Sequence, residues 1–213
     1  MAQYYDISRP LYPGMVVWPG ETEFQLEPTA RLAKGDTVNV TKLTLGAHTG
    51  THVDAPFHFT EGGQTLEQVD VAPYWGPAQV VTVSKPSGPL TPDDFAGYDL
   101  RRAPRLLVHS ALSEADHNVF HKEFVHPGPE LADFLGQQGI VLYGADGPSM
   151  DHPDNPKLPG HHALQRNGIL ILEGLDLTGV PDGLYELSAL PLKIVAGDGC
   201  PVRAVLRSVD AAS

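Results

Sequence analysis

The sequence predicts a single α/β domain with a β-rich core and few helices, on three observations. Short apolar runs bounded by proline and glycine dominate the first half of the chain. From about residue 129 onward, helical patterns alternate with strand-like runs, as in α/β proteins. The 213 residues are enough for one substantial core, and no linker-like stretch divides them. We therefore expect one domain over residues 1–213.

The first half is expected to contribute mainly strands. Apolar and β-branched runs predict strands at Tyr4 to Ile7, Met15 to Trp18, Val38 to Leu45, Ala78 to Ser84 and Arg105 to His109. A short helix is expected after Thr91, because threonine is a good N-cap and Pro92 suits the first helical turn.

The second half is expected to alternate helices with strands. Helical spacing predicts helices at Pro129 to Gln138, ended by Gly139, and at His161 to Asn167, ended by Gly168. Strands are predicted at Ile140 to Tyr143, Ile169 to Leu172, Leu184 to Leu187, Leu192 to Val195 and Val202 to Arg207.

Composition excludes several functions. The formal net charge is −12 without a basic cluster, which argues against nucleic acid or an anionic membrane as a partner. The single cysteine, Cys200, excludes an intramolecular disulfide and is interpreted as a small packing residue. The first ten residues lack a signal-peptide pattern, and no apolar segment has transmembrane length, so we expect a cytoplasmic protein.

The segment His48-Thr-Gly-Thr-His52-Val-Asp54-Ala-Pro-Phe-His58 carries the strongest functional signal. Imidazole nitrogens and a carboxylate oxygen suit zinc, manganese or ferrous iron, and no thiolate lies nearby to suggest a structural zinc site. His48, His52 and Asp54 would give a metal three protein ligands and an open position, the arrangement of a catalytic site.

Backbone preferences indicate how these side chains can meet. Glycine, threonine, valine and proline within the segment disfavour a helix. Gly50 permits a sharp turn that would bring His48 back toward His52. In extended chain, residues two apart face the same side, so His52 and Asp54 would share a site that His58 continues.

A second cation would need further ligands, and the best source is His161 or His162 together with Glu173. Glu173 ends a four-residue apolar run, where a buried carboxylate is costly unless it is paired or binds a cation. The alternative is that Glu173 is the first solvated residue of a turn. The other histidines are interpreted as non-functional: His117 and His121 as a solvated helical face, and His109, His126 and His152 as structural.

The motif resembles the signature of the cyclase-family metal hydrolases, which include bacterial kynurenine formamidases and isatin hydrolases. The resemblance extends along nearly the whole chain, and its later segments look closest to the kynurenine formamidases. It is carried by Asp6 to Ser8, Val17 to Gly20, Val38 to Val40, Leu158 to Ala163, Ile171 to Leu175, Tyr185 to Leu187, Leu190 to Lys193 and Pro201 to Leu206.

The resemblance implies a swivelling β/β/α fold, a homodimer and two divalent ions per chain, most often Zn²⁺, with Mn²⁺ as an alternative. His48, His52 and Asp54 would hold one ion, and a bridging Asp54, His161 and Glu173 the other. The family pattern favours His161 over His162. It also places His58 at the proton-transfer position and Trp18 at a substrate-contacting position.

The implied activity is hydrolysis of N-formyl-L-kynurenine, a small-molecule aryl amide, to L-kynurenine and formate in tryptophan degradation. An isatin-hydrolase-like opening of a cyclic amide is the alternative within the family. Two other classes remain open: a non-heme iron oxygenase using His52, Asp54 and a distant histidine, and a metal-binding protein without catalysis.

Overall fold

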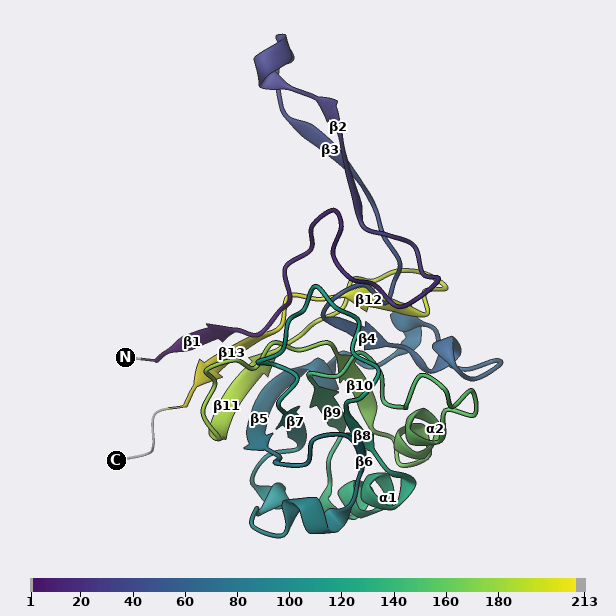
Figure 1. The fold of residues 1–213 in the computed structure, drawn as a ribbon, viewed down its shortest axis with the longest axis vertical. Coiled ribbons are helices and arrows are strands. Elements are labelled where there is room, and N and C mark those ends of the chain that lie inside the picture. The colour runs from purple at the N-terminus through teal and green to yellow at the C-terminus, as the bar shows by residue number, and fades with distance from the viewer. Residues whose placement is uncertain (1, 210–213) are drawn as a thin grey trace.

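The computed structural model describes residues 2–209 and is built around one mixed nine-stranded sheet (Figure 1). In spatial order the strands are β1 (Tyr4–Asp6), β13 (Val205–Ser208), β11 (Gly183–Ser188), β5 (Trp75–Thr82), β7 (Arg105–His109), β9 (Leu142–Ala145), β10 (Leu170–Glu173), β4 (His52–Asp54) and β12 (Gly199–Pro201). The four central strands, β5, β7, β9 and β10, are parallel to one another. The strands on either side of them pair antiparallel.

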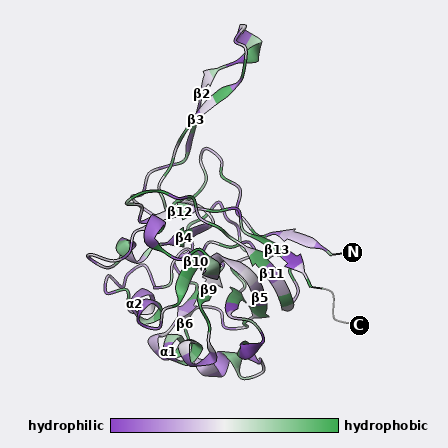
Figure 2. Ribbon diagram, turned by 180° about the vertical axis from the view of Figure 1, so that it is seen from behind, coloured by the Kyte–Doolittle hydropathy of each residue, from purple (hydrophilic) through white to green (hydrophobic). Residues whose placement is uncertain are grey.

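Two helices cover one face of this sheet. Helix α1 (Pro129–Gln138) precedes β9, and α2 (Pro159–Arg166) connects β9 to β10, so both belong to parallel crossover connections. Along β7 the side chains alternate between two buried clusters: Leu106 and Val108 pack with α1 and α2, whereas Leu107 packs on the opposite face. Figure 2 shows the hydrophobic residues gathered in the central strands.

The remaining elements lie outside the large sheet. Strands β2 (Gln25–Ala30) and β3 (Val40–Thr44) form a hairpin that projects far from the body (Figure 1), and β6 (Gly88–Leu90) pairs with β8 (Val125–Pro127). Six 3₁₀ turns are formed by Leu32–Lys34, Pro56–His58, Leu66–Gln68, Ala72–Tyr74, Pro92–Phe95 and Leu100–Arg102. Within residues 2–209, no helix combines the length and hydropathy needed to span a membrane.

The predicted α/β class with few helices is confirmed, but two of the predicted strands are wrong. Met15 to Trp18 forms no strand, and these side chains instead line a pocket. Leu192 to Val195 is irregular, because Ile194 closes a tight turn onto the carbonyl of Leu192 and the side chain of Val195 is 77% exposed. Strands β2, β6, β8 and β12 were not predicted, since each contains a proline and none has a long apolar run.

Candidate metal centre

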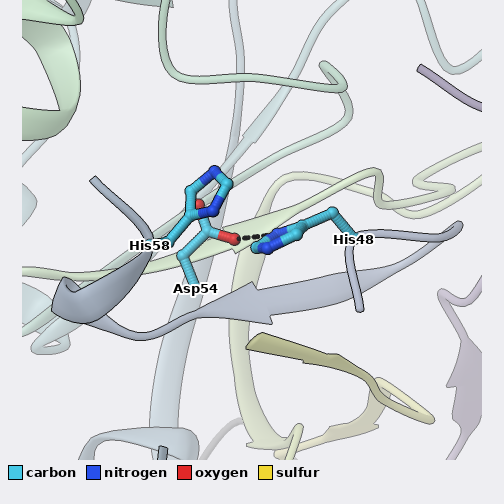
Figure 3. A group of neighbouring side chains, drawn as sticks. All are labelled: His48, Asp54 and His58. Carbon is cyan, nitrogen blue, oxygen red and sulfur yellow. Dashed lines mark hydrogen bonds and ion pairs between the residues drawn. The ribbon is translucent and has the colours of Figure 1, made fainter. Parts of the chain in front are cut away.

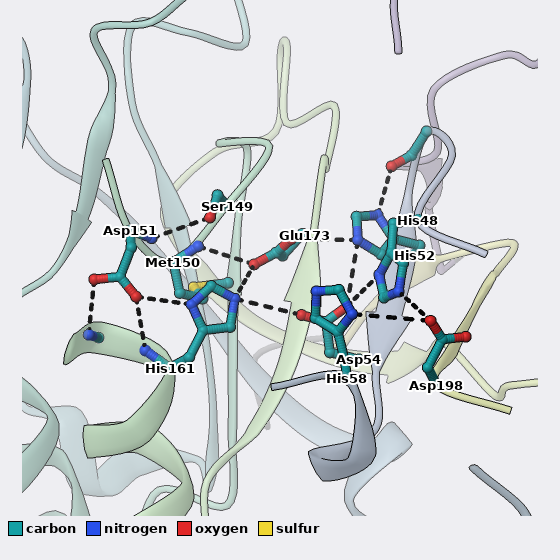
Figure 4. Close-up of polar contacts among 12 residues, drawn as sticks. His48, His52, Asp54, His58, Ser149, Met150, Asp151, His161, Glu173 and Asp198 are labelled. Atoms are coloured by element: carbon teal, nitrogen blue, oxygen red, sulfur yellow. Dashed lines mark hydrogen bonds and ion pairs between the residues drawn. The ribbon is translucent and has the colours of Figure 1, made fainter. Parts of the chain in front are cut away.

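The candidate site lies where β4 and β10 pair in front of the first turn of α2 (Figure 4). In the antiparallel register, His52 stands opposite Glu173 and Asp54 opposite Ile171. Because side chains alternate along a strand, His52, Asp54 and Glu173 share the sheet face that α2 covers, while Val53 packs into the core on the other face. The register therefore brings three polar side chains together.

The turn at Gly50 brings His48 to this group, as the sequence predicts. Gly50 has a φ of +67°, and a β-carbon there would lie 2.6 Å from the side chain of Leu11, so a larger residue would be strained and crowded. The rings of His48 and His52 lie 5.1 Å apart between centroids. His52 Nδ1 lies 2.9 Å from the carbonyl oxygen of Gly50, which leaves Nε2 to face the carboxylates.

Asp54 connects two groups of side chains that are close enough to hold cations. One group is His52, Asp54 and Glu173, in which His52 Nε2 lies 3.4 Å from Asp54 Oδ1 and 3.2 Å from Glu173 Oε2. All three residues are at most 3% exposed. The interpretation of Glu173 as a solvated turn residue is therefore wrong.

The other group is His48, Asp54 and His58 (Figure 3). His48 Nδ1 lies 2.8 Å from Asp54 Oδ1, and the rings of His48 and His58 lie 3.8 Å apart between centroids. The side chain of His58 is 34% exposed, whereas that of Asp54 is fully buried. His58 therefore forms the solvent-facing side of the cluster.

His161 joins the cluster from the first turn of α2. Its Nε2 lies 3.6 Å from Asp54 Oδ2 and 3.4 Å from Glu173 Oε1. The neighbouring His162 is exposed and contacts the ring of Phe59 instead. Gly160 allows this helix start to approach the chain, because a β-carbon there would lie 2.2 Å from the carbonyl oxygen of Met150.

Two carboxylates that the sequence analysis did not single out orient these histidines. Asp151 accepts hydrogen bonds from the backbone N–H groups of Gly160 and His161, and its Oδ2 lies 2.8 Å from His161 Nδ1. Asp198 Oδ2 lies 3.2 Å from His48 Nε2 and 3.9 Å from His58 Nδ1. The only local signal for Asp198 is its position between two glycines, which is too common to identify it.

The electrostatics of the cluster favour a bound cation. Burial raises the pKa of Asp54, but close contacts with His161, His48 and His52 outweigh burial and hold this pKa well below its usual range. Burial lowers the pKa of His52, but contacts with Asp54 and Glu173 raise it to about 10. The buried carboxylates are therefore stabilised by nearby positive charge. A divalent ion can supply this charge in place of protons on the histidines.

The donor atoms also fit a metal ion. Asp54 Oδ2 and His52 Nε2 are buried and have no hydrogen-bond partner among the described residues. Buried polar atoms without partners are costly, and these two face the centre of the cluster (Figure 4). Mixed imidazole and carboxylate donors are the set that zinc and manganese accept.

A pocket with aromatic walls adjoins the cluster. Trp18 and Phe120 pack edge to face, 5.3 Å apart between ring centroids, and both line this pocket. His48 and His52 line it too, so the pocket opens onto the cluster. Phe57 and Phe59, which flank His58, do not line it: Phe57 is 42% exposed, and Phe59 packs against His161.

The remaining histidines are separate from the cluster. His117 and His121 lie in a non-helical loop and line the pocket, so their interpretation as a solvated helical face is wrong. His109 faces Glu114 at 3.8 Å and His152 faces Glu123 at 3.4 Å, and neither histidine belongs to the two groups of possible metal donors. Cys200 is fully buried, as a packing residue should be.

Comparison with known sequences identifies a protein family and several relatives that match nearly the whole chain. The family model Cyclase, described as "Putative cyclase", matches residues 5–152. A kynurenine formamidase of Bacillus mycoides is 41% identical over 208 residues, covering 98% of this chain and 99% of that protein. A kynurenine formamidase of Salinibacter ruber is 43% identical over 203 residues, covering 95% and 96% of the two chains.

Solved structures similar to this chain share its fold. A "potential metal-dependent hydrolase with cyclase activity" superposes with a TM-score of 0.84 at 31% identity, covering 99% of this chain and all of the other. A "predicted metal-dependent hydrolase" of Bacillus stearothermophilus gives a TM-score of 0.82 at 30% identity, covering 97% and 98%. An isatin hydrolase gives 0.82 at 22% identity, covering 98% and 93%, a similarity of fold alone.

Proposed function

The chain belongs to the Cyclase family, and we propose that it is a metal-dependent amidohydrolase that converts N-formyl-L-kynurenine to L-kynurenine and formate. One observation carries this proposal: the buried cluster of imidazoles and carboxylates opens directly onto the aromatic pocket. Trp18, His48 and His52 line both the pocket and the cavity at the cluster. Full-length relatives that are kynurenine formamidases supply the substrate. An aryl formamide has a ring for the pocket and a carbonyl for the cluster.

Two divalent ions are proposed for the cluster. His48, His52 and Asp54 would hold one, and Asp54, His161 and Glu173 the other, with zinc as the metal and manganese as the alternative. The membership of Asp54 in both groups of donor residues supports a bridging carboxylate. When bound, such ions act as Lewis acids that lower the pKa of water and polarise a carbonyl group.

His58 is proposed to transfer the proton. It is the most exposed histidine of the cluster, so it reaches both solvent and a molecule in the site. Its imidazole would take a proton from the attacking water and return it to the aryl nitrogen when the C–N bond breaks, a role worth roughly 10²- to 10⁴-fold in rate. Asp198, 3.9 Å from His58 Nδ1, would orient the ring.

Trp18 and Phe120 are proposed to position the substrate. Their edge-to-face arrangement leaves apolar surface in the pocket beside His48. An aryl ring held there would place its formamide nitrogen at the cluster, which converts an encounter into an oriented attack.

We also propose a homodimer. The hairpin carries exposed Leu26, Leu32 and Leu43, and an apolar surface of this kind is buried in subunit contacts. Light scattering of the purified protein measures the assembly directly, and a monomeric mass at micromolar concentration contradicts this proposal.

The substrate proposal is tested with the purified, metal-loaded protein. N-formyl-L-kynurenine should be hydrolysed with a much higher kcat/KM than isatin or formanilide, and one formate should be released per kynurenine. A preference for isatin would show that the substrate is a cyclic amide. Oxygen consumption in place of anaerobic hydrolysis would indicate an oxygenase, and full metal loading without turnover would indicate a binding protein.

A further inference from the structure

Two residues that line the pocket but lie outside the metal cluster each carry a buried nitrogen atom that has no hydrogen-bond partner among the described residues. They are Nε of Arg9 and Nδ1 of His117, and both residues line the pocket together with Trp18 and Phe120. Neither residue is needed for the proposed metal set or for proton transfer. Unpaired buried polar atoms are uncommon in proteins, and beside an open pocket they indicate a polar group of a ligand.

Arg9 carries a positive charge without a direct ion-pair partner among the described residues, although Asp146 and Asp176 lie near enough for their charges to act on it. Its terminal nitrogen donates to the backbone carbonyl oxygen of Asp146 at 2.6 Å, and within residues 2–209 it forms no ion pair. The Asp146 carboxylate is already engaged, because its oxygens accept hydrogen bonds from the hydroxyl groups of Ser110 and Ser113. Burial lowers the pKa of Arg9, because removing this charge from water is costly, and the charges of Asp146 and Asp176 offset only part of this effect.

His117 lies close enough to Arg9 to feel its charge. Burial and then the Arg9 charge lower the pKa of His117, so the ring next to Arg9 is neutral. A neutral imidazole has one N–H to donate. An anion bound between the two residues would pair directly with Arg9 and accept a hydrogen bond from His117.

The backbone fixes Arg9 relative to the cluster. Its N–H donates to Thr51 Oγ1 at 2.8 Å, and the Thr51 hydroxyl donates to the carbonyl of Gly174 at 2.6 Å. Thr51 precedes His52, and Gly174 follows Glu173. A ligand group held by Arg9 is therefore set at a defined position relative to the metal donors.

We propose that Arg9, assisted by His117, binds the α-carboxylate of an amino-acid substrate in this pocket. The inference rests on the proposed function and deepens it, since N-formyl-L-kynurenine carries a carboxylate at the end of its tail and isatin carries none. The planar guanidinium group matches a carboxylate with paired hydrogen bonds. With the aryl ring packed against Trp18 and Phe120, the formamide would reach the cluster while the tail reaches Arg9.

The test compares the acid with its methyl ester, which has the same ring and formamide but no negative charge. For the metal-loaded wild-type protein, kcat/KM should be higher for N-formyl-L-kynurenine than for its methyl ester by about 10- to 100-fold, the range of one charge-assisted hydrogen bond. Arg9→Met should remove this preference by lowering kcat/KM for the acid and leaving the ester unchanged. Arg9→Lys should restore part of it.

The control is Arg31→Met, which removes an exposed arginine from the hairpin and should leave both rates unchanged. Equal losses for acid and ester in Arg9→Met would show a structural role and overturn the inference. If that variant does not fold, the wild-type protein still decides: L-kynurenine should inhibit at least tenfold more strongly than its methyl ester, and equal inhibition overturns the inference. Turnover of neither formyl compound by the wild-type protein would instead refute the proposed function.

Discussion

Strand β4 and the β2–β3 hairpin are both short antiparallel segments of the first 60 residues, but they occupy opposite environments. The three residues of β4 are at most 3% exposed and pair on both sides, with β10 and with β12. The hairpin pairs only with itself and exposes Leu26 by 47% and Leu43 by 55%. Two of the three β4 side chains are ionisable, whereas the hairpin leaves apolar side chains in solvent.

This contrast shows that the β4 region carries buried ionisable groups that lower its stability but are needed for the proposed chemistry. Burying His52 and Asp54 with Glu173 costs free energy that ordinary packing would not require, and mutual contacts or a bound cation must offset it. The hairpin carries no such group. Substitutions of the same type should therefore have very different effects in the two regions.

The largest difference is expected for a glutamate. Glu173→Gln should reduce metal content and lower turnover by more than about 10²-fold, beyond the 10- to 100-fold typical of residues that only support metal ligands. Glu27→Gln in the hairpin, where the side chain is 66% exposed, should change neither. Elemental analysis and formate release measure both variants. Retained metal in Glu173→Gln would remove Glu173 from the ligand set.

A histidine pair separates ligation from proton transfer. His58→Ala should lower kcat by roughly 10²- to 10⁴-fold while metal content stays unchanged. His162→Ala, also exposed and in the same part of the molecule, is the matched control and should keep its activity. Loss of metal in His58→Ala would instead show that His58 is a ligand, consistent with its place beside His48 and Asp54.

The metal itself should stabilise the β4 region more than the hairpin. An ion at 100 times its Kd adds about 2.7 kcal/mol to the free energy of unfolding. For a chain of this size the chelated protein should melt roughly 5 to 11 °C lower. Hydrogen exchange should increase in β4 and β10 on chelation and stay constant in the hairpin. An unchanged melting temperature would contradict a cation at the cluster.

The smallest effect is expected for a leucine in the hairpin. Leu43→Ala should change the free energy of unfolding by less than about 0.5 kcal/mol, because the side chain is 55% exposed. Leu172→Ala in β10, which is fully buried, should cost about 2 to 5 kcal/mol. Urea denaturation compares the two. A large loss for Leu43→Ala, together with a smaller molecular mass, would show that the hairpin holds the proposed homodimer together.

Features that depend on neighbouring residues could be predicted from the sequence, whereas contacts between distant residues could not. The turn at Gly50 and helix α1, with Gly139 after its end, follow from the preferences of a few neighbouring residues, and both were predicted. Asp198 and Phe120 were missed, because each reaches the site only through contacts with residues far away along the chain. No local pattern records such contacts.

The strand order of the sheet also determines when this site can form during folding. His52 meets Glu173 across one edge of β4, and Asp54 meets Gly199 across the other, so each contact closes a loop of more than a hundred residues. Strand β1 likewise pairs with β13 near the other end of the chain. Contacts this distant form slowly, and chains dominated by them fold in about milliseconds to seconds. During synthesis, β4 therefore remains without partners until β10 and β12 have been made, more than a hundred residues later, and the proposed metal donors assemble only then.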